Sequence, residues 1–152
     1  MSGAVLGDVL EIPTGKGLAY AQHTHQHPQF GGLIRVFDVI SQSRPTDIAE
    51  LVKQPVRFSI FFPVRAAVKR GIFKVIGRAE TVPSNRIFPV FRDGIANPKT
   101  GKVAEWWLWD GQREWKVGTL TRQQMQFPLR RIWNDSLLVQ RIEEGWRAEN
   151  ET

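Results

Sequence analysis

The chain has 152 residues, no cysteine and a net charge of +6 at neutral pH, with 41% hydrophobic and 24% charged residues. This length suits one domain with a hydrophobic core, and the composition excludes a disordered or fibrous chain. The missing cysteines exclude disulfides, thiolate metal centres and cysteine nucleophiles. No apolar run approaches the roughly 20 residues of a membrane span, and the N-terminal MSGAVLGDVLEIP carries no targeting signal. We therefore expect a single cytoplasmic domain over residues 1–152.

Apolar residues that alternate along most of the chain predict a mostly β protein. The turn-forming stretches TGKG and PQFGG separate the first three strands, and prolines bound the clearest strand, PVRFSIFFP. The expected strands lie at residues 7–13, 18–26, 33–40, 55–63, 71–79 and 86–91. Together they predict an α+β fold that is mostly β, with a twisted antiparallel sheet or partly open barrel, short helices and a C-terminal helix.

Helical signals are few and short. Residues 44–54 place apolar side chains at helical spacing, and TRQQM, residues 121–125, contains a capping box. The strongest signal is near the C-terminus, where Asn134 or Asp135 can cap a helix and Gly145 can end it.

Positive charge is concentrated in the middle of the chain. Residues 51–92 contain nine Lys or Arg and one acidic residue, Glu80, so this segment carries +8 and the remainder −2. Such a segment favours an acidic partner, or it forms a solvated face that keeps the protein soluble. The candidate partner-binding cations are Arg57, Arg65, Lys69, Arg70, Lys74 and Arg78. Phenylalanines interleave with them, so nucleic-acid binding stays an alternative, although no nucleic-acid motif is present.

The sequence VAEWWLWDGQREWKVG, residues 103–118, predicts a β-hairpin. A two-residue turn at Asp110-Gly111 would place Trp106 and Trp115 on a core face and pair Glu105 with Lys116 across the strands. The opposite face then carries Trp107 and Trp109. These two form either a partner-binding surface or a second core layer covered by a helix or loop.

Residues 95–103 upstream of this hairpin predict a four-residue loop at 98–101, so three strands would form a meander. Asp93-Gly94 would interrupt the first of these strands.

All three histidines, His23, His25 and His27, lie two residues apart in one segment. Two neighbours on a strand can share a zinc ion, but three on one straight strand cannot easily reach a single tetrahedral ion. A complete site would need carboxylates from elsewhere, such as Asp8, Glu11 or Asp38. The sequence contains no strong catalytic motif, and a Ser-His-Asp arrangement has no local support. We therefore expect no cofactor and an exposed polar strand end at the histidines, with zinc as the alternative.

The stretches GDVLEIP, GLAYAQ and VFDV, followed by VGTLTRQQMQFPLRRIWNDSLLVQRIEEGW, resemble the immunity protein 26 family of bacterial polymorphic toxin systems. Family naming also links this group to a small phosphotriesterase. The positions that carry the resemblance are Gly7, Asp8, Ile12, Pro13, Tyr20, Leu120, Pro128, Ile142, Gly145 and Trp146. Physically these are turn, capping and packing positions, and the histidines do not belong to the pattern.

The resemblance implies a mostly β domain with a helical C-terminus. It also implies a cytoplasmic protein that binds and neutralises a toxin encoded nearby, by stoichiometric occlusion and without chemistry of its own. The alternatives are a small metal-dependent phosphotriester hydrolase that uses the histidines, and a basic nucleic-acid-binding module. The basic middle of the chain contrasts with the acidic surface of inhibitors that cap nuclease toxins.

Overall fold

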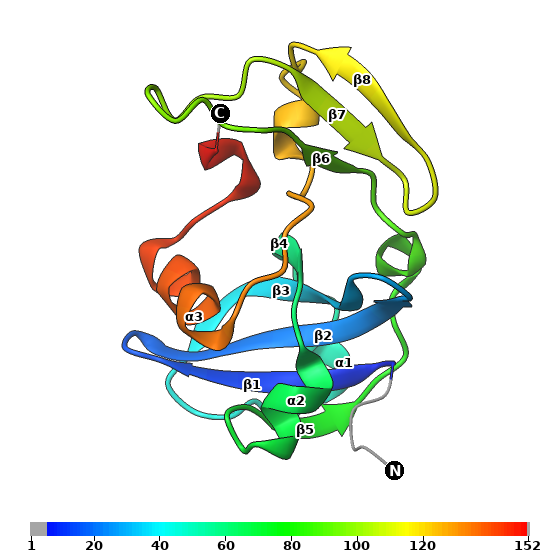
Figure 1. The fold of residues 1–152 in the computed structure, drawn as a ribbon. Helices are drawn as coiled ribbons and strands as arrows, with labels where there is room; N and C mark the ends of the chain where they lie inside the picture. Colours follow the sequence, from blue (N-terminus) through cyan, green and yellow to red (C-terminus); the bar gives the residue numbers. More distant parts are fainter. Residues whose placement is uncertain (1–5, 152) are drawn as a thin grey trace. The chain divides into compact units, whose positions relative to one another are not determined.

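The computed structural model of the chain describes residues 6–151, which form two compact units (Figure 1). Unit 1 contains the residues up to Ile87 together with Ile132–Trp146. Unit 2 contains Phe88–Arg131 and the segment from Arg147 onward. Residues 1–5, the start of the N-terminal segment in which no targeting signal is expected, lie outside the described residues. The single domain over residues 1–152 stays a prediction.

The expected fold class is confirmed. The described residues are mostly β, their two sheets are antiparallel, and neither sheet closes into a barrel. Three short helices accompany the sheets, one of them near the C-terminus. Among residues 6–151, no helix is long and apolar enough to cross a membrane.

Unit 1 is built on a five-stranded sheet with the order β4-β3-β2-β1-β5. Its strands are β1 Asp8–Thr14, β2 Gly17–His27, β3 Gly31–Ser41, β4 Val56–Phe61 and β5 Lys74–Arg78. Both faces of β1 are buried, since Val9 and the alternate residues Leu10 and Ile12 are all inaccessible to solvent. A core cluster on the Val9 face also contains Tyr20, Phe37, Leu51 and Val52.

The C-terminal helix has the predicted caps. Helix α3, Asp135–Glu144, begins where the Asn134 side chain accepts the Leu137 N–H at 2.8 Å. It ends at Gly145, whose φ of 72° lets the next N–H reach back to the Arg141 carbonyl oxygen.

The other helical elements are single turns or little more. Helix α1, Ile48–Leu51, lies in the predicted segment, and the capping box at Thr121 leads into a short 3₁₀ turn, Gln124–Gln126. Helix α2, Val64–Lys69, was not foreseen in the sequence.

The strand expected at 86–91 is wrong for most of its length. Its first residue, Arg86, ends a 3₁₀ turn, Pro83–Arg86, and only its last residue, Phe91, belongs to a strand, β6, Phe91–Asp93. The backbone at residues 85–87 has side chains of the five-stranded sheet as hydrogen-bond partners, where a strand would have a neighbouring strand. Arg35 on β3 donates to two of its carbonyl oxygens, and His25 contacts a third.

Unit 2 contains a three-stranded meander with the order β6-β7-β8, in which β7 is Trp106–Trp109 and β8 is Glu114–Gly118. The loop at 98–101 is confirmed, because the Asn97 N–H donates to the Lys102 carbonyl oxygen at 2.8 Å. Arg92 in β6 is completely buried. It donates to the Phe127 and Ala148 carbonyl oxygens, and its guanidinium lies 4.6 Å from the centre of the Trp106 ring.

A buried hydrogen bond links the first two strands of unit 1. The hydroxyl of Tyr20 donates to Glu11 at 3.0 Å, and Arg44 donates to both oxygens of the same carboxylate at 2.9 Å. Burial, and then this hydrogen bond, raises the pKa of Tyr20 to about 12. The hydrogen bond from Arg44 is the main reason that the pKa of Glu11 is lowered.

Because the chain has one tyrosine, its ionisation can be followed without ambiguity. We expect tyrosinate absorbance to appear near pH 12 in the folded protein and near pH 10 in denaturant. Since the folded pKa is the higher one, this stabilisation is present below pH 10 and is lost as the pH rises towards 12. Glu11→Gln should lower the folded transition, and circular dichroism should confirm that each sample is still folded. A transition near pH 10 in folded wild-type protein would contradict this assignment.

Candidate functional site

Two of the predicted partner-binding cations belong to the framework of unit 1. Arg57 on β4 donates to Asp38 at 3.0 Å and to the Ile142 carbonyl oxygen at 3.2 Å, so it links β4 to α3. Arg78 on β5 pairs with the buried Asp8 at 3.1 Å. These two cations therefore have intramolecular partners.

Four other predicted cations are exposed and have no carboxylate partner among the described residues. We call Arg65, Lys69, Arg70 and Lys74 the α2–β5 cations. Arg65 and Lys69 lie four positions apart on α2, where side chains of like charge face the same side and repel each other. The segment thus concentrates positive charge that has no direct ion-pair partner within residues 6–151.

Local sequence places these cations outward. Val64 and Ala67 are the buried residues of α2, so its polar residues face solvent. The helix ends at Lys69 and is capped by Arg70; the next residue, Gly71, has a φ of +73°, and its N–H donates to the Val68 carbonyl oxygen at 3.1 Å. The N–H of Ile72 reaches the Ala67 carbonyl oxygen at 2.9 Å, which completes a Schellman motif and turns the chain into β5.

The charge of the α2–β5 cations acts on neighbouring groups. Burial lowers the pKa of His23, and Arg65 lowers it further. Lys74 adds to the effect of Arg44 in lowering the pKa of Glu11.

The three histidines have separate surroundings. The pairing of β2 with β3 shifts register between His23 and His25, so the regular alternation is broken there. The Nε2 atom of His23 lies 3.1 Å from Gln26 Oε1, whereas that of His25 lies 2.9 Å from the Arg86 carbonyl oxygen. The His27 ring packs against two phenylalanine rings.

His23 is buried, contrary to the expected exposed strand end, because Gly32 beside it leaves room for the ring. The carboxylates considered as further ligands are each bound by an arginine; the pairs are Asp8 with Arg78, Glu11 with Arg44, and Asp38 with Arg57. Within residues 6–151, no three His, Asp or Glu side chains are arranged to hold one metal ion. Zinc binding by the histidines stays a prediction, and no complete set of zinc ligands is found among the described residues.

The tryptophan hairpin has a longer turn than expected. The Asp110 carboxylate accepts the N–H groups of Gln112 at 2.9 Å and Arg113 at 2.8 Å, which stabilises a four-residue loop. Trp109 therefore pairs with Glu114 rather than with Gln112. The predicted ion pair of Glu105 with Lys116 nevertheless forms, with a distance of 2.9 Å.

The burial of the four hairpin tryptophans agrees only in part with the prediction. Trp106 is buried as predicted, but Trp115 pairs with Leu108 and is 40% exposed, so its predicted core position is wrong. Trp107 is 38% exposed, whereas Trp109 is buried. The groups that cover Trp109 are Phe88, Phe91 and the Arg130 guanidinium. The second-core alternative therefore holds for Trp109 but not for Trp107.

Trp107 lines a pocket of about 480 Å³ within unit 2. Asp93, Trp107 and Lys116 lie opposite one another across β6, β7 and β8, so they share one face of the sheet. The groups that line the pocket include Trp107, Ile95, Asp93, Glu105, Glu114 and Arg130.

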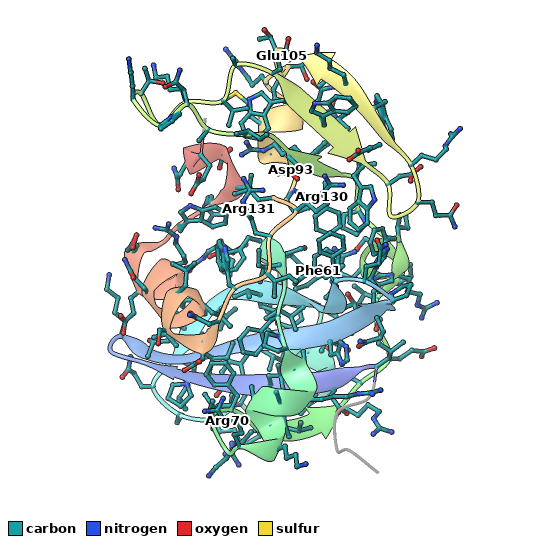
Figure 2. All side chains as sticks on the ribbon, in the orientation of Figure 1. Phe61, Arg70, Asp93, Glu105, Arg130 and Arg131 are labelled. Carbon is teal, nitrogen blue, oxygen red and sulfur yellow. The ribbon has the colours of Figure 1, made fainter. Side chains whose placement is uncertain are left out.

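An ion-pair network closes one side of this pocket. Arg130 donates to Asp93 at 3.1 and 2.8 Å and pairs with Glu114 at 3.0 Å, while Arg131 donates to the other Asp93 oxygen. Figure 2 shows both arginines beside Asp93. Burial alone would raise the pKa of Asp93, but the hydrogen bonds from the two arginines outweigh it and hold this pKa below its usual value.

Sequence reasoning missed Arg130 and Arg131. The available signals were their adjacent charges and an aspartate that interrupts a strand 37 positions earlier. Nothing in the linear sequence pairs positions so far apart.

One family model, described as Immunity protein 26, matches residues 5–101, which is more than half of the chain. The match includes the α2–β5 cations, whereas Trp107, Glu105, Glu114 and Arg130 lie beyond it. No curated protein and no solved structure matches the chain.

The two face-sharing tryptophans should differ in their effect on stability. Trp109→Ala should lower the free energy of unfolding by about 3–5 kcal/mol because it empties a buried site. Trp107→Ala should cost less than about 1 kcal/mol because the ring is partly solvated. Urea denaturation of both variants, with Trp115→Ala as the exposed control, measures the difference. Equal losses for Trp107 and Trp109 would contradict the described packing.

Proposed function

Because the chain belongs to the immunity protein 26 family, we propose that it is a cytoplasmic immunity-type protein that neutralises a bacterial toxin encoded nearby. It acts by stoichiometric binding, which occludes the toxin without chemistry of its own. The family match is the observation that carries this proposal. The toxin is the partner protein, and the protein needs no cofactor for this role.

We further propose that the α2–β5 cations contact an acidic surface of the toxin. Five of the nine cations in residues 51–92 already have partners within the chain: Lys53, Arg57, Arg78, Arg86 and Arg92. The remaining four are exposed, and two of them, Arg65 and Lys69, lie four positions apart on α2, where like charges repel each other. Carboxylates of a partner would relieve this repulsion and accelerate encounter, as complementary surface charges do.

The first test is protection. The neighbouring gene that encodes a large secreted protein with a C-terminal toxin domain would be expressed with and without this chain. We expect cells that express the toxin to grow only when this chain is co-expressed. We also expect a one-to-one complex of the two proteins by size-exclusion chromatography with light scattering. Loss of growth despite co-expression, or no complex at micromolar concentrations, would refute the proposal.

The second test addresses the surface. Reversing the four α2–β5 cations to glutamate should weaken toxin binding at least about tenfold, mainly through slower association, and should reduce its salt dependence. The matched control reverses four exposed cations elsewhere, Lys16, Lys99, Lys102 and Arg122, which changes the net charge equally. Surface plasmon resonance at two salt concentrations measures the rates.

Equal weakening by both quadruple variants would show a general charge effect and contradict the proposed surface. Unchanged toxin binding, together with nucleic-acid retention that the α2–β5 reversal abolishes, would instead assign these cations to nucleic acid. Circular dichroism of each variant checks that it is folded.

A further inference from the structure

The pocket beside Trp107 combines a partly exposed indole with carboxylates. Glu105 and Glu114 line it, with side chains that are 61% and 50% exposed. Ile95 adds an apolar side chain that is almost fully exposed. The volume of about 480 Å³ lies within the roughly 300–1,000 Å³ typical of ligand pockets.

The two glutamates retain hydrogen-bonding capacity. Glu105 uses one oxygen to contact Lys116 at 2.9 Å, and Glu114 uses one oxygen to contact Arg130 at 3.0 Å. An ionised carboxylate has about four acceptor positions on two oxygens. Each glutamate can therefore accept further hydrogen bonds from a ligand.

The lining cation, by contrast, already has a carboxylate partner at each of its three guanidinium nitrogens. The guanidinium of Arg130 donates from Nε and Nη2 to Asp93 and from Nη1 to Glu114, and it lies 5.3 Å from the centre of the Trp109 ring. It has little capacity left for an anionic ligand. Spare acceptors, an engaged donor and an indole together favour a cationic occupant.

We propose that this pocket binds an arginine side chain presented by a partner protein. The planar guanidinium would stack on the indole of Trp107, and its N–H groups would donate to Glu105 and Glu114. This site is separate from the α2–β5 cations and would recognise the opposite charge. Most of its lining, including Trp107 and both glutamates, lies beyond residue 101, where the family match ends.

The test uses the full chain and a small probe, so its outcome does not depend on any toxin. N-acetyl-arginine amide would be titrated into protein labelled with ¹⁵N, and N-acetyl-citrulline amide would serve as the neutral isostere. We expect the Trp107 indole and the Gly94 and Ile95 amides to shift with a Kd on the order of 1 mM. Citrulline should bind at least about tenfold more weakly, because it lacks the charge.

Variants test the assigned contacts. With the Gly94 and Ile95 amides as reporters, Trp107→Ala should weaken arginine binding about tenfold and Glu105→Gln about fivefold. Trp115→Ala is the matched aromatic control, because that ring has similar exposure but lies on the other sheet face. Glu149→Gln, an exposed carboxylate of unit 2 outside the pocket lining, is the matched charge control.

Three outcomes would overturn the proposal. The first is the absence of shifts at Trp107 with about 20 mM probe, well above the expected Kd. The second is equal binding of arginine and citrulline. The third is equal weakening by the pocket variants and their controls.

Discussion

Buried arginines that donate to backbone carbonyl oxygens are the constraint on which the rest of this structure depends. Irregular segments leave carbonyl groups without strand or helix partners, and such groups must be satisfied when they are buried. Arg35 and Arg57 in unit 1 and Arg92 in unit 2 each supply donors from a strand to such a segment or to a helix end. The carbonyl groups that they reach belong to Asn85, Ile87, Ile142, Phe127 and Ala148. Burial lowers the pKa of Arg35 to about 10, which still leaves it charged at neutral pH.

This use of arginine changes how the basic middle of the chain is understood. A count of charges places a net charge of +8 in residues 51–92, which favours an acidic partner or a solvated face. In the structure, guanidinium groups such as those of Arg57 and Arg92 hold backbone segments and are largely withdrawn from solvent. Among the exposed cations, Lys53, Arg78 and Arg86 are paired with carboxylates, which leaves the α2–β5 cations, two of them on a short helix that the sequence pattern did not reveal. Charge density along a sequence overstates the charge available to a partner when arginines serve as internal donors.

The tryptophan hairpin shows why local pattern was insufficient. The sequence Asp-Gly favours a two-residue turn, but the Asp110 carboxylate accepts two N–H groups beyond it and stabilises a longer loop. The pairing moved by two positions, so Trp115 keeps the face that it was predicted to share with Trp106, but it lies opposite Leu108 on the edge strand β8 and is 40% exposed. Alternation alone also cannot separate Trp107 from Trp109, which share a face. Their different burial depends on rings and an arginine from distant parts of unit 2.

The sequence by itself determined the elements whose signals are local. Alternating apolar residues marked the strands of unit 1, and Asn134 and Gly145 marked the ends of α3, because pleating and capping depend on near neighbours. The sequence also sufficed to indicate the family, whose model matches residues 5–101. Only the tertiary structure decided which cations are left for a partner and which tryptophan lines a pocket. Those properties depend on contacts such as that of Arg130 with Asp93. The two residues are 37 positions apart in the sequence, so no local pattern predicts that they are in contact.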